Sequence, residues 1–280
     1  MIRVGGIILS LHPLLVLIML LSVLTGQFLE LITLFSIVFI HEMGHVCAAK
    51  IAGVTVKSVQ LLPFGGVAVI EDHGRLTALR EIAIALAGPL QNGLMILFSL
   101  LLQRTGNGSG EFLNYFIQAN AVIALFNLLP ILPLDGGKVL QALISLLAPY
   151  YSTLLWCGRI SIGASGIVIA YSLLPMGTTG GVRLNILLIG AFLLYSNITD
   201  HRNLPYRFVA FLMNRGAVYE RYISSGVQAR PIVALSAKPL DDILRLFKRN
   251  RYHFIYVLNG KGNVMAVVPE QRLVASYFGI

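Results

Sequence analysis

Charged residues are scarce in this chain of 280 residues, making up 12% of it against roughly 25% in soluble domains. Hydrophobic residues make up 56%, and the mean hydropathy is +0.80. So few charges cannot cover a water-facing surface, which excludes an ordinary soluble protein. We expect a polytopic α-helical membrane protein.

Cysteine is rarer still. The two cysteines, Cys47 and Cys157, both lie in apolar segments that we expect to be membrane helices. Their number and position exclude a disulfide scaffold. An internal repeat is also missing, although many transporters are built from two repeats.

The charge that is present gathers at one end of the chain. Residues 1–200 carry 9 Lys or Arg against 8 Asp or Glu, whereas residues 201–280 carry 12 against 4. A basic tail after the last span is typical of a cytoplasmic segment near anionic lipid. The tail has no interleaved aromatic platform, so we expect no nucleic-acid partner.

Apolar runs predict about six transmembrane helices, roughly at 5–25, 28–49, 79–102, 113–130, 153–174 and 184–199. Between the second and third, residues 54–62 and 67–70 alternate like two short strands around a Pro-Phe-Gly-Gly turn, which predicts a membrane-associated β-hairpin. With a cytoplasmic N-terminus, most Lys and Arg of the connections fall inside. We therefore expect a multi-pass protein with both termini in the cytoplasm.

The sequence His-Glu-Met-Gly-His at residues 41–45 lies inside the second apolar run. Two histidines four residues apart on a helix share one face and can hold one metal ion, here Zn²⁺. Glu42 would lie beside that ion without ligating it, as in zinc hydrolases. Polar groups at membrane depth indicate function by default. We predict that His41 and His45 are metal ligands and that Glu42 is the general base.

A second polar group follows the fourth apolar run. Pro130 and Pro133 break the helix and two glycines follow, so Asp135 lies on irregular backbone at a membrane helix end. Asp135 is either the third protein ligand of a catalytic zinc or the N-cap of a helix over residues 138–148. We favour the ligand, because a catalytic zinc needs a third protein ligand and the alternative acid, Glu30, lies about a dozen residues up its own helix. The predicted topology, which puts His45 and Asp135 on the same side of the membrane, agrees with this choice.

Taken together, four segments resemble the site-2 protease family of intramembrane zinc metalloproteases, and in particular its sporulation branch. They occur in family order at residues 41–45, 62–66, 87–92 and 127–138. The family often has Asn-Pro-Asp-Gly where this chain has Leu134-Asp135-Gly136, a departure shared by the sporulation branch.

This resemblance implies a zinc metalloendopeptidase that cleaves in or near the membrane segment of a tethered precursor, which is regulated intramembrane proteolysis. It implies substrate contacts by Asn127, Phe64, Gly65 and Pro133. Packing is an alternative role for Asn127. For the sporulation branch the substrate would be a sigma-K-type precursor. Inhibitory membrane proteins would be partners, and the location would be the mother-cell membrane around the forespore.

The tail beyond residue 200 reads as a small α/β domain. We expect a transmembrane metalloprotease domain at 1–200, a helical linker at 201–222, and a domain at 223–280 that resembles a single cystathionine-β-synthase (CBS) unit. Its strands are predicted at 231–235, 253–258 and 264–268. Such units usually pair, which implies a homo-oligomer, and ATP binding by this domain is a hypothesis from the same resemblance.

One alternative class is a metal-ion transporter with a regulatory CBS domain. Intramembrane histidines and acids also suit ion pathways. A transporter would use Glu42 only as a charge, so Asp could replace it.

Overall fold

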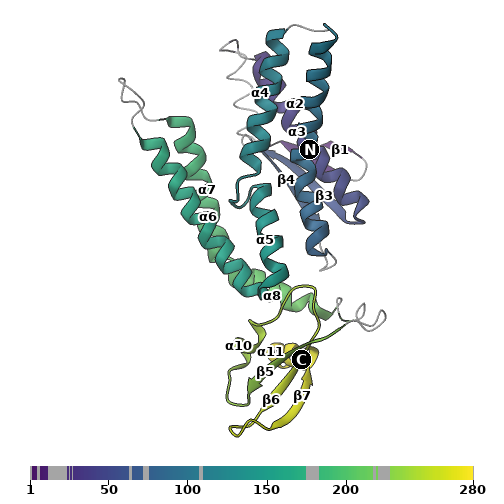
Figure 1. Cartoon of the computed structure of the whole chain (residues 1–280), viewed down its shortest axis with the longest axis vertical. Coiled ribbons are helices and arrows are strands. Elements are labelled where there is room, and N and C mark those ends of the chain that lie inside the picture. Colours follow the sequence, from purple (N-terminus) through teal and green to yellow (C-terminus); the bar gives the residue numbers. More distant parts are fainter. Residues whose placement is uncertain are drawn as a thin grey trace. The chain divides into compact units, whose positions relative to one another are not determined.

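The structure is a computed structural model of the whole chain (Figure 1). It describes residues 2–4, 7–11, 24, 26, 28–62, 65–71, 76–106, 110–174, 183–216, 219 and 228–279. The chain forms two compact units, which are described separately below. The first comprises residues 1–72 and 79–139, and the second comprises residues 73–78 and 140–280.

Long apolar helices dominate the first unit (Figure 1). They are α2 (Phe28–Ile51), α3 (Ala78–Arg104) and α4 (Gly110–Asn127), and α5 (Asp135–Leu147) begins in this unit and continues into the second. The first three are helices at the positions of the predicted second, third and fourth spans, and α2 and α3 are also long and apolar enough to cross a membrane. Their apolar runs are long enough for several helical turns, and the bounds follow the glycines and charged residues that flank them.

The first unit also contains a four-stranded sheet, of which only two strands were predicted. The strands β1 (Ile2–Val4), β2 (Ile7–Leu11), β3 (Thr55–Leu62) and β4 (Gly65–Glu71) lie in sequence order, and β2 runs parallel to β3. The predicted first span over 5–25 is therefore wrong for residues 7–11. Those residues pair with β3. Their apolar sequence is the same as that expected of a membrane helix, because the strand partner lies far away in the sequence. Most of the remainder, residues 12–23, lies outside the described residues.

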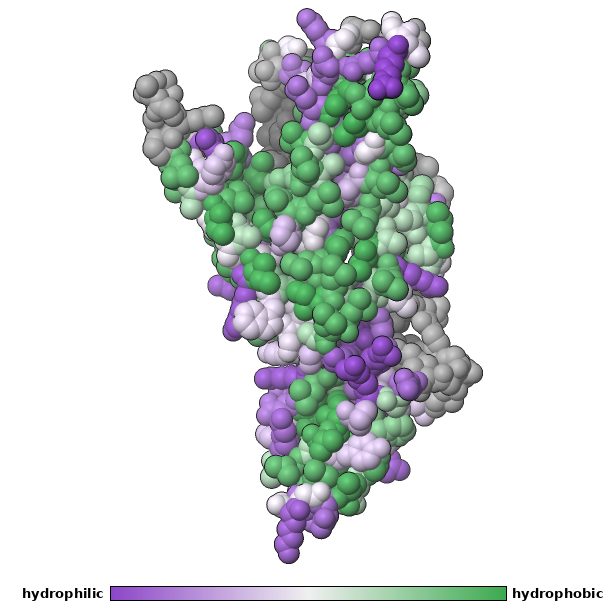
Figure 2. Space-filling view, viewed as in Figure 1, coloured by the Kyte–Doolittle hydropathy of each residue, from purple (hydrophilic) through white to green (hydrophobic). Residues whose placement is uncertain are grey.

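Three helices are long and apolar enough to cross a membrane in the part of the chain that the structure describes: α2, α3 and α6 (Tyr150–Leu173). Large apolar side chains on these helices are exposed, for example Leu97 and Phe98 of α3, whereas Asn92 of the same helix is fully buried. Figure 2 shows broad hydrophobic areas over the helices. This inside-out polarity is that of a membrane protein.

Helix α6 pairs with α7 (Leu184–Arg202) in the second unit (Figure 1). Their interface buries small and polar residues. Ser161 and Ser165 are covered, and the Asn197 amide donates to the Leu193 carbonyl at 2.8 Å. Small residues let membrane helices approach closely, and buried polar groups need partners there.

The tail of the second unit is a three-stranded sheet with helices on one side. Its elements are α8 (Leu204–Met213), β5 (Arg230–Leu235), α10 (Leu240–Leu244), β6 (His253–Leu258), β7 (Val264–Pro269) and α11 (Glu270–Phe278). β5 is parallel to β6, and β6 is antiparallel to β7. The three strands match the predicted ones to within about one residue at each end.

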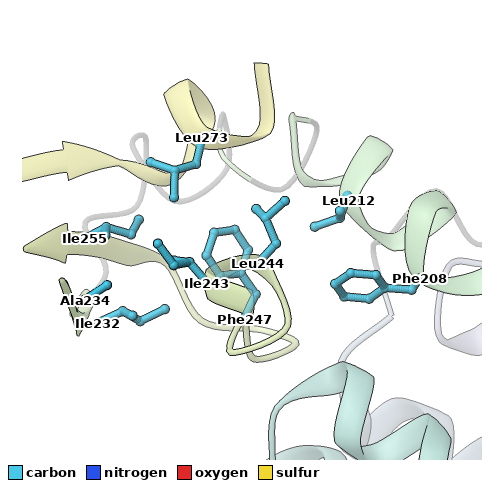
Figure 3. Close-up of a cluster of buried hydrophobic side chains, with 9 residues drawn as sticks. All are labelled: Phe208, Leu212, Ile232, Ala234, Ile243, Leu244, Phe247, Ile255 and Leu273. Atoms are coloured by element: carbon cyan, nitrogen blue, oxygen red, sulfur yellow. The ribbon is translucent and has the colours of Figure 1, made fainter. Parts of the chain in front are cut away.

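Helix α8 is part of this core and does not act as a separate linker. Phe208 and Leu212 of α8 point toward Leu244, Phe247 and the sheet (Figure 3). The compact units divide between residues 139 and 140, within α5 and not at residues 200 or 222. The Tyr150 amide also donates to the Phe247 carbonyl at 2.9 Å, which anchors the start of α6 on the same core.

A buried ion pair joins the chain just after α8 to the first residue of α11. Arg215 contacts both carboxylate oxygens of Glu270, at 3.1 and 2.5 Å, and His253 Nδ1 lies 3.0 Å from Glu270 Oε2. Burial lowers the pKa of His253; the hydrogen bond to Glu270 opposes this shift, and the positive charge of Arg215 reinforces it. His253 is therefore neutral in the folded tail.

Candidate metal centre

Helix α2 presents its three predicted polar side chains to the protein interior. His41, Glu42 and His45 are 2%, 6% and 6% exposed, although their helix is one of the three apolar candidate spans. Their ligand atoms lie within 4.8 Å of one another. Burying two imidazoles and a carboxylate at membrane depth is costly unless they share a partner.

Asp135 completes a triangle with the two histidines. His41 Nε2 and His45 Nε2 each lie 3.1 Å from Asp135 Oδ2, and the two Nε2 atoms lie 3.2 Å apart. Ligands at about 2.0–2.1 Å from a tetrahedral zinc are about 3.3 Å from each other. The observed triangle therefore has nearly the dimensions of three ligands around one ion.

Each imidazole carries a proton on Nδ1, so that in the neutral ring Nε2 has a free lone pair. His45 Nδ1 is 2.7 Å from the Ile84 carbonyl, which can only accept, so Nδ1 must be the donor. His41 Nδ1 is 2.5 Å from the amide oxygen of Asn92 in the same way. In the neutral form of both rings, two Nε2 lone pairs and a carboxylate oxygen face one another, and a bound cation would stabilise that arrangement. These residues fit a zinc ion with three protein ligands.

Asp135 is the first residue of α5 and does not occupy the N-cap position. The Leu134 carbonyl accepts the first helical hydrogen bond, from the amide of Lys138 at 3.1 Å. The second carboxylate oxygen of Asp135 accepts from Lys138 Nζ at 3.1 Å. Gly137 permits this turn, because a Cβ there would lie 2.6 Å from the Ile131 carbonyl oxygen. The carboxylate is thus aimed at the histidines.

Glycines let α3 pack directly against the histidine face of α2. A Cβ on Gly88 would lie 2.5 Å from His41 Nε2, and a Cβ on Gly44 would lie 2.7 Å from the Ala87 carbonyl oxygen. Real Cβ contacts are longer than 3.0 Å in practice. Any other residue at position 88 would therefore occupy the space where the ligand atoms meet.

The predicted substrate contacts do not gather in this triangle. Asn127 ends α4, where its amide donates to the Ile123 carbonyl at 3.0 Å. Pro133 is exposed two residues before Asp135. Gly65 begins β4, opposite Leu62, and Phe64 lies outside the described residues. Their role as substrate contacts stays a prediction.

Ile84, Asn92 and Lys138 were not assigned to the site by sequence reasoning. Asn92 belongs to the Ala-Gly-Pro-Leu-Gln-Asn segment singled out at residues 87–92, but its partner lies 51 residues away. The Ile84 contribution is a backbone carbonyl, which carries no side-chain signal. Lys138 could have been suspected from its spacing of three residues after Asp135 on a helix.

Buried in apolar helices, this His-Glu-x-x-His geometry with a distant Asp defines an intramembrane zinc metalloprotease as the class of protein. The model for Peptidase family M50 matches residues 29–108 and 102–151. The match covers α2, α3 and α4 and continues through α5, so it includes all four predicted catalytic and metal-binding positions.

Comparison with known proteins extends the similarity to nearly the whole chain. Stage IV sporulation protein FB of Bacillus subtilis is 30% identical over 277 residues, which cover 95% of this chain and 90% of that protein. A zinc metalloprotease of Methanocaldococcus jannaschii is 32% identical over 148 residues, covering 52% of this chain and 43% of that protein. The solved site-2 protease from M. jannaschii covers 72% of this chain and 94% of its own, with a TM-score of 0.57 and 25% identity.

This chain therefore belongs to Peptidase family M50, the site-2 proteases, and is a membrane-bound zinc metalloprotease. The family membership favours the protease over the metal-ion transporter.

Proposed function

We propose that His41, His45 and Asp135 hold one Zn²⁺ and that Glu42 is the general base of an intramembrane endopeptidase. The observation that carries this proposal is the convergence of three potential ligand atoms at 3.1–3.2 Å, while Nδ1 of each imidazole is already hydrogen-bonded to an oxygen acceptor. Glu42 is buried beside them on the same helix.

Zinc bound at this triangle would lower the pKa of a water and polarise the scissile carbonyl. Glu42 takes a proton from the attacking water and later gives it to the leaving amide nitrogen. The hydrogen bonds of Ile84 and Asn92 keep both imidazoles in the ligand tautomer throughout. Lys138 holds the other oxygen of Asp135, so that only Oδ2 faces the histidines.

The substrate we propose is a membrane-tethered precursor of the sigma-K type, cleaved in or near its membrane segment. Strand β4 supports an extended substrate, because it is the last strand of the sheet among the described residues and contacts α2. A peptide can add to such an edge by main-chain hydrogen bonds. Gly65, on that strand, and Phe64 before it would then contact substrate. Asn127 at the end of α4 and Pro133 beyond it would do the same.

The cellular setting we propose is the mother-cell membrane around the forespore, with both termini in the cytoplasm and inhibitory membrane proteins as partners. The basic tail supports this orientation, since 12 of the 21 Lys and Arg residues lie beyond residue 200. The setting and the partners follow from the sporulation relative and the resemblance of the sequence.

We further propose that the chain forms homo-oligomers through its CBS-like tail. One face of the β5–β6–β7 sheet is covered by the core, whereas the other exposes large apolar residues from all three strands: Val233, Leu235, Phe254, Met265 and Val267. A self-complementary apolar face suits a symmetric contact between two copies. ATP binding by this tail rests on the resemblance to CBS domains alone.

The test is cleavage of a tagged sigma-K-type precursor in membranes by wild type and by Glu42→Gln, with zinc measured in both. Glutamine keeps the shape and leaves all three ligands in place. Glu30→Gln is the matched control, since Glu30 is an exposed acid on the same helix. We expect Glu42→Gln to keep zinc and lose cleavage, and Glu30→Gln to keep both.

Two results would go against the proposal. Cleavage by Glu42→Gln at the wild-type rate would remove Glu42 from its role as base. Absence of zinc from the wild-type protein would remove the metal centre itself.

A further inference from the structure

Three residues of α3 form one stripe beneath the two histidines. Ile84, Gly88 and Asn92 are spaced by four, so they lie on one face of the helix. The Ile84 carbonyl accepts from His45, Gly88 leaves room for both rings, and Asn92 meets His41. The two imidazoles are therefore supported from the same helix, but by different chemistry.

Asn92 is part of a hydrogen-bond chain through three helices. Its amide oxygen lies 2.5 Å from His41 Nδ1, and its amide nitrogen donates to Asn120 Oδ1 of α4 at 3.0 Å. Asn120 in turn donates to the Phe116 carbonyl at 2.9 Å. Both asparagines are 0% exposed.

The direction of this chain is set at its far end. A backbone carbonyl can only accept, so Phe116 fixes the Asn120 amide with its nitrogen toward the carbonyl and its oxygen toward α3. Asn92 must then present its nitrogen to Asn120 and its oxygen to His41. His41 must carry its proton on Nδ1, and its Nε2 lone pair is left facing Asp135 Oδ2 at 3.1 Å.

We propose that Asn92 is a positioning residue that holds His41 in its zinc-ligand tautomer, and that Asn120 acts through Asn92 by orienting its amide. The inference rests on the proposed zinc site, because it assigns a role toward His41 as a ligand. A different role for the two asparagines is to hold α3 and α4 together, since buried amides also link membrane helices. The two roles respond differently to substitution.

The experiment measures zinc affinity by chelator competition on the purified full-length protein. We expect Asn92→Leu to weaken zinc binding by about 10–100-fold, the usual cost of losing such a partner. Asn92→Asp keeps an acceptor oxygen and should hold zinc nearly as well as wild type. Ser99→Ala is the matched control, because Ser99 is a buried polar residue of α3 whose hydrogen bond among the described residues goes to Met95 of its own helix.

A double-mutant cycle separates orientation from packing. Asn120→Leu lets the Asn92 amide flip and should weaken zinc binding in the wild-type background. In the Asn92→Asp background the same substitution should cost little, because a carboxylate presents an oxygen in either orientation. The visible spectrum of the cobalt-loaded protein reports the ligand set directly, and it should follow the zinc affinities across the four variants.

Equal losses for Asn92→Leu and Asn92→Asp would overturn the inference in favour of helix packing. An Asn120→Leu effect that is the same in both backgrounds would do the same. His41→Ala separates this failure from that of the zinc site: if His41→Ala binds zinc like wild type, the proposed centre is wrong whatever Asn92 does.

Discussion

Gly88→Ala adds a single methyl group next to the histidine nitrogens of the proposed metal centre. Residue 88 lies on α3 between the supports of the two histidines, and the added methyl would lie 2.5 Å from His41 Nε2. That distance is about 1 Å inside an ordinary carbon–nitrogen contact of roughly 3.5 Å. The methyl points at the atoms that would hold the metal, so a shift of either ring to relieve the clash also disturbs the ligand triangle.

Two effects act on different quantities, the stability of the helix and the affinity for zinc. Alanine in place of glycine favours a helix by up to about 1 kcal/mol. Overpacking of this kind costs about 1–3 kcal/mol, and the cost falls on the metal-competent geometry. At about 1.4 kcal/mol per factor of ten, zinc affinity should drop by about 5–150-fold while the helix itself is no less stable.

Gly93→Ala is the control on the same helix, because nothing lies within 4 Å of a Cβ built there. Both variants gain the same helix propensity, so their difference isolates the clash. The assay compares zinc retained after a chelator challenge and the initial rate of precursor cleavage. If Gly88→Ala retains zinc and cleaves as well as Gly93→Ala, the packing of α3 against the histidines is not as described.

Other expectations concern the support of Asp135 and the tail. Lys138→Met removes a half-exposed partner of Asp135, whose interaction is worth at most about 1 kcal/mol after solvent screening. Chelator competition should therefore show no more than about a fivefold loss of zinc affinity, and a loss above about fiftyfold would contradict this expectation. Arg215→Met leaves the buried carboxylate of Glu270 without its cationic partner and should lower the stability of the tail, measured by hydrogen exchange, by about 3–5 kcal/mol. Adding Glu270→Gln should recover part of this loss, and no recovery would refute the ion pair. The pKa of His253 is lower in the folded tail than its unfolded value of 6.5, so stability should be constant above pH 6.5 and fall below it by up to about 1.4 kcal/mol per pH unit. His253→Asn should remove that slope, and a slope that persists would assign it to another group.

The membrane helices could be predicted because their signal is local. An apolar run such as that of α2 or α3 specifies a helix within its own residues, and the predicted and observed bounds agree closely. Strand β2 carries the same apolar signal but pairs with β3, some fifty residues later. Nothing within residues 7–11 reveals that partner, so the sequence of this run alone predicts a membrane helix.

The same distinction separates the ligands of the site from their supports. His41 and His45 belong to one helical motif, and Asp135 stands out as an acid at a predicted membrane helix end. Asn92 and the Ile84 carbonyl acquire their roles only when α3 packs on α2. Their contacts depend on Gly44 and Gly88 and on crossing geometry that no single segment encodes.

The tail shows how packing redefines a boundary. The strands were predictable from alternation and β-branched residues. Phe208 and Leu212 of α8 read as part of a linker, because a short apolar helix after a membrane span has no obvious partner in sequence. In the structure they fill the core beside Phe247, so α8 belongs to the folded tail.

The most direct test of the central claim is zinc X-ray absorption on the purified full-length protein, which reports the ligands of the bound metal. We expect one zinc per chain with two imidazole nitrogens and oxygen ligands at about 2.0–2.2 Å, and one oxygen ligand fewer in Asp135→Ala. A sulfur ligand, or a single imidazole, would contradict the assignment of His41, His45 and Asp135.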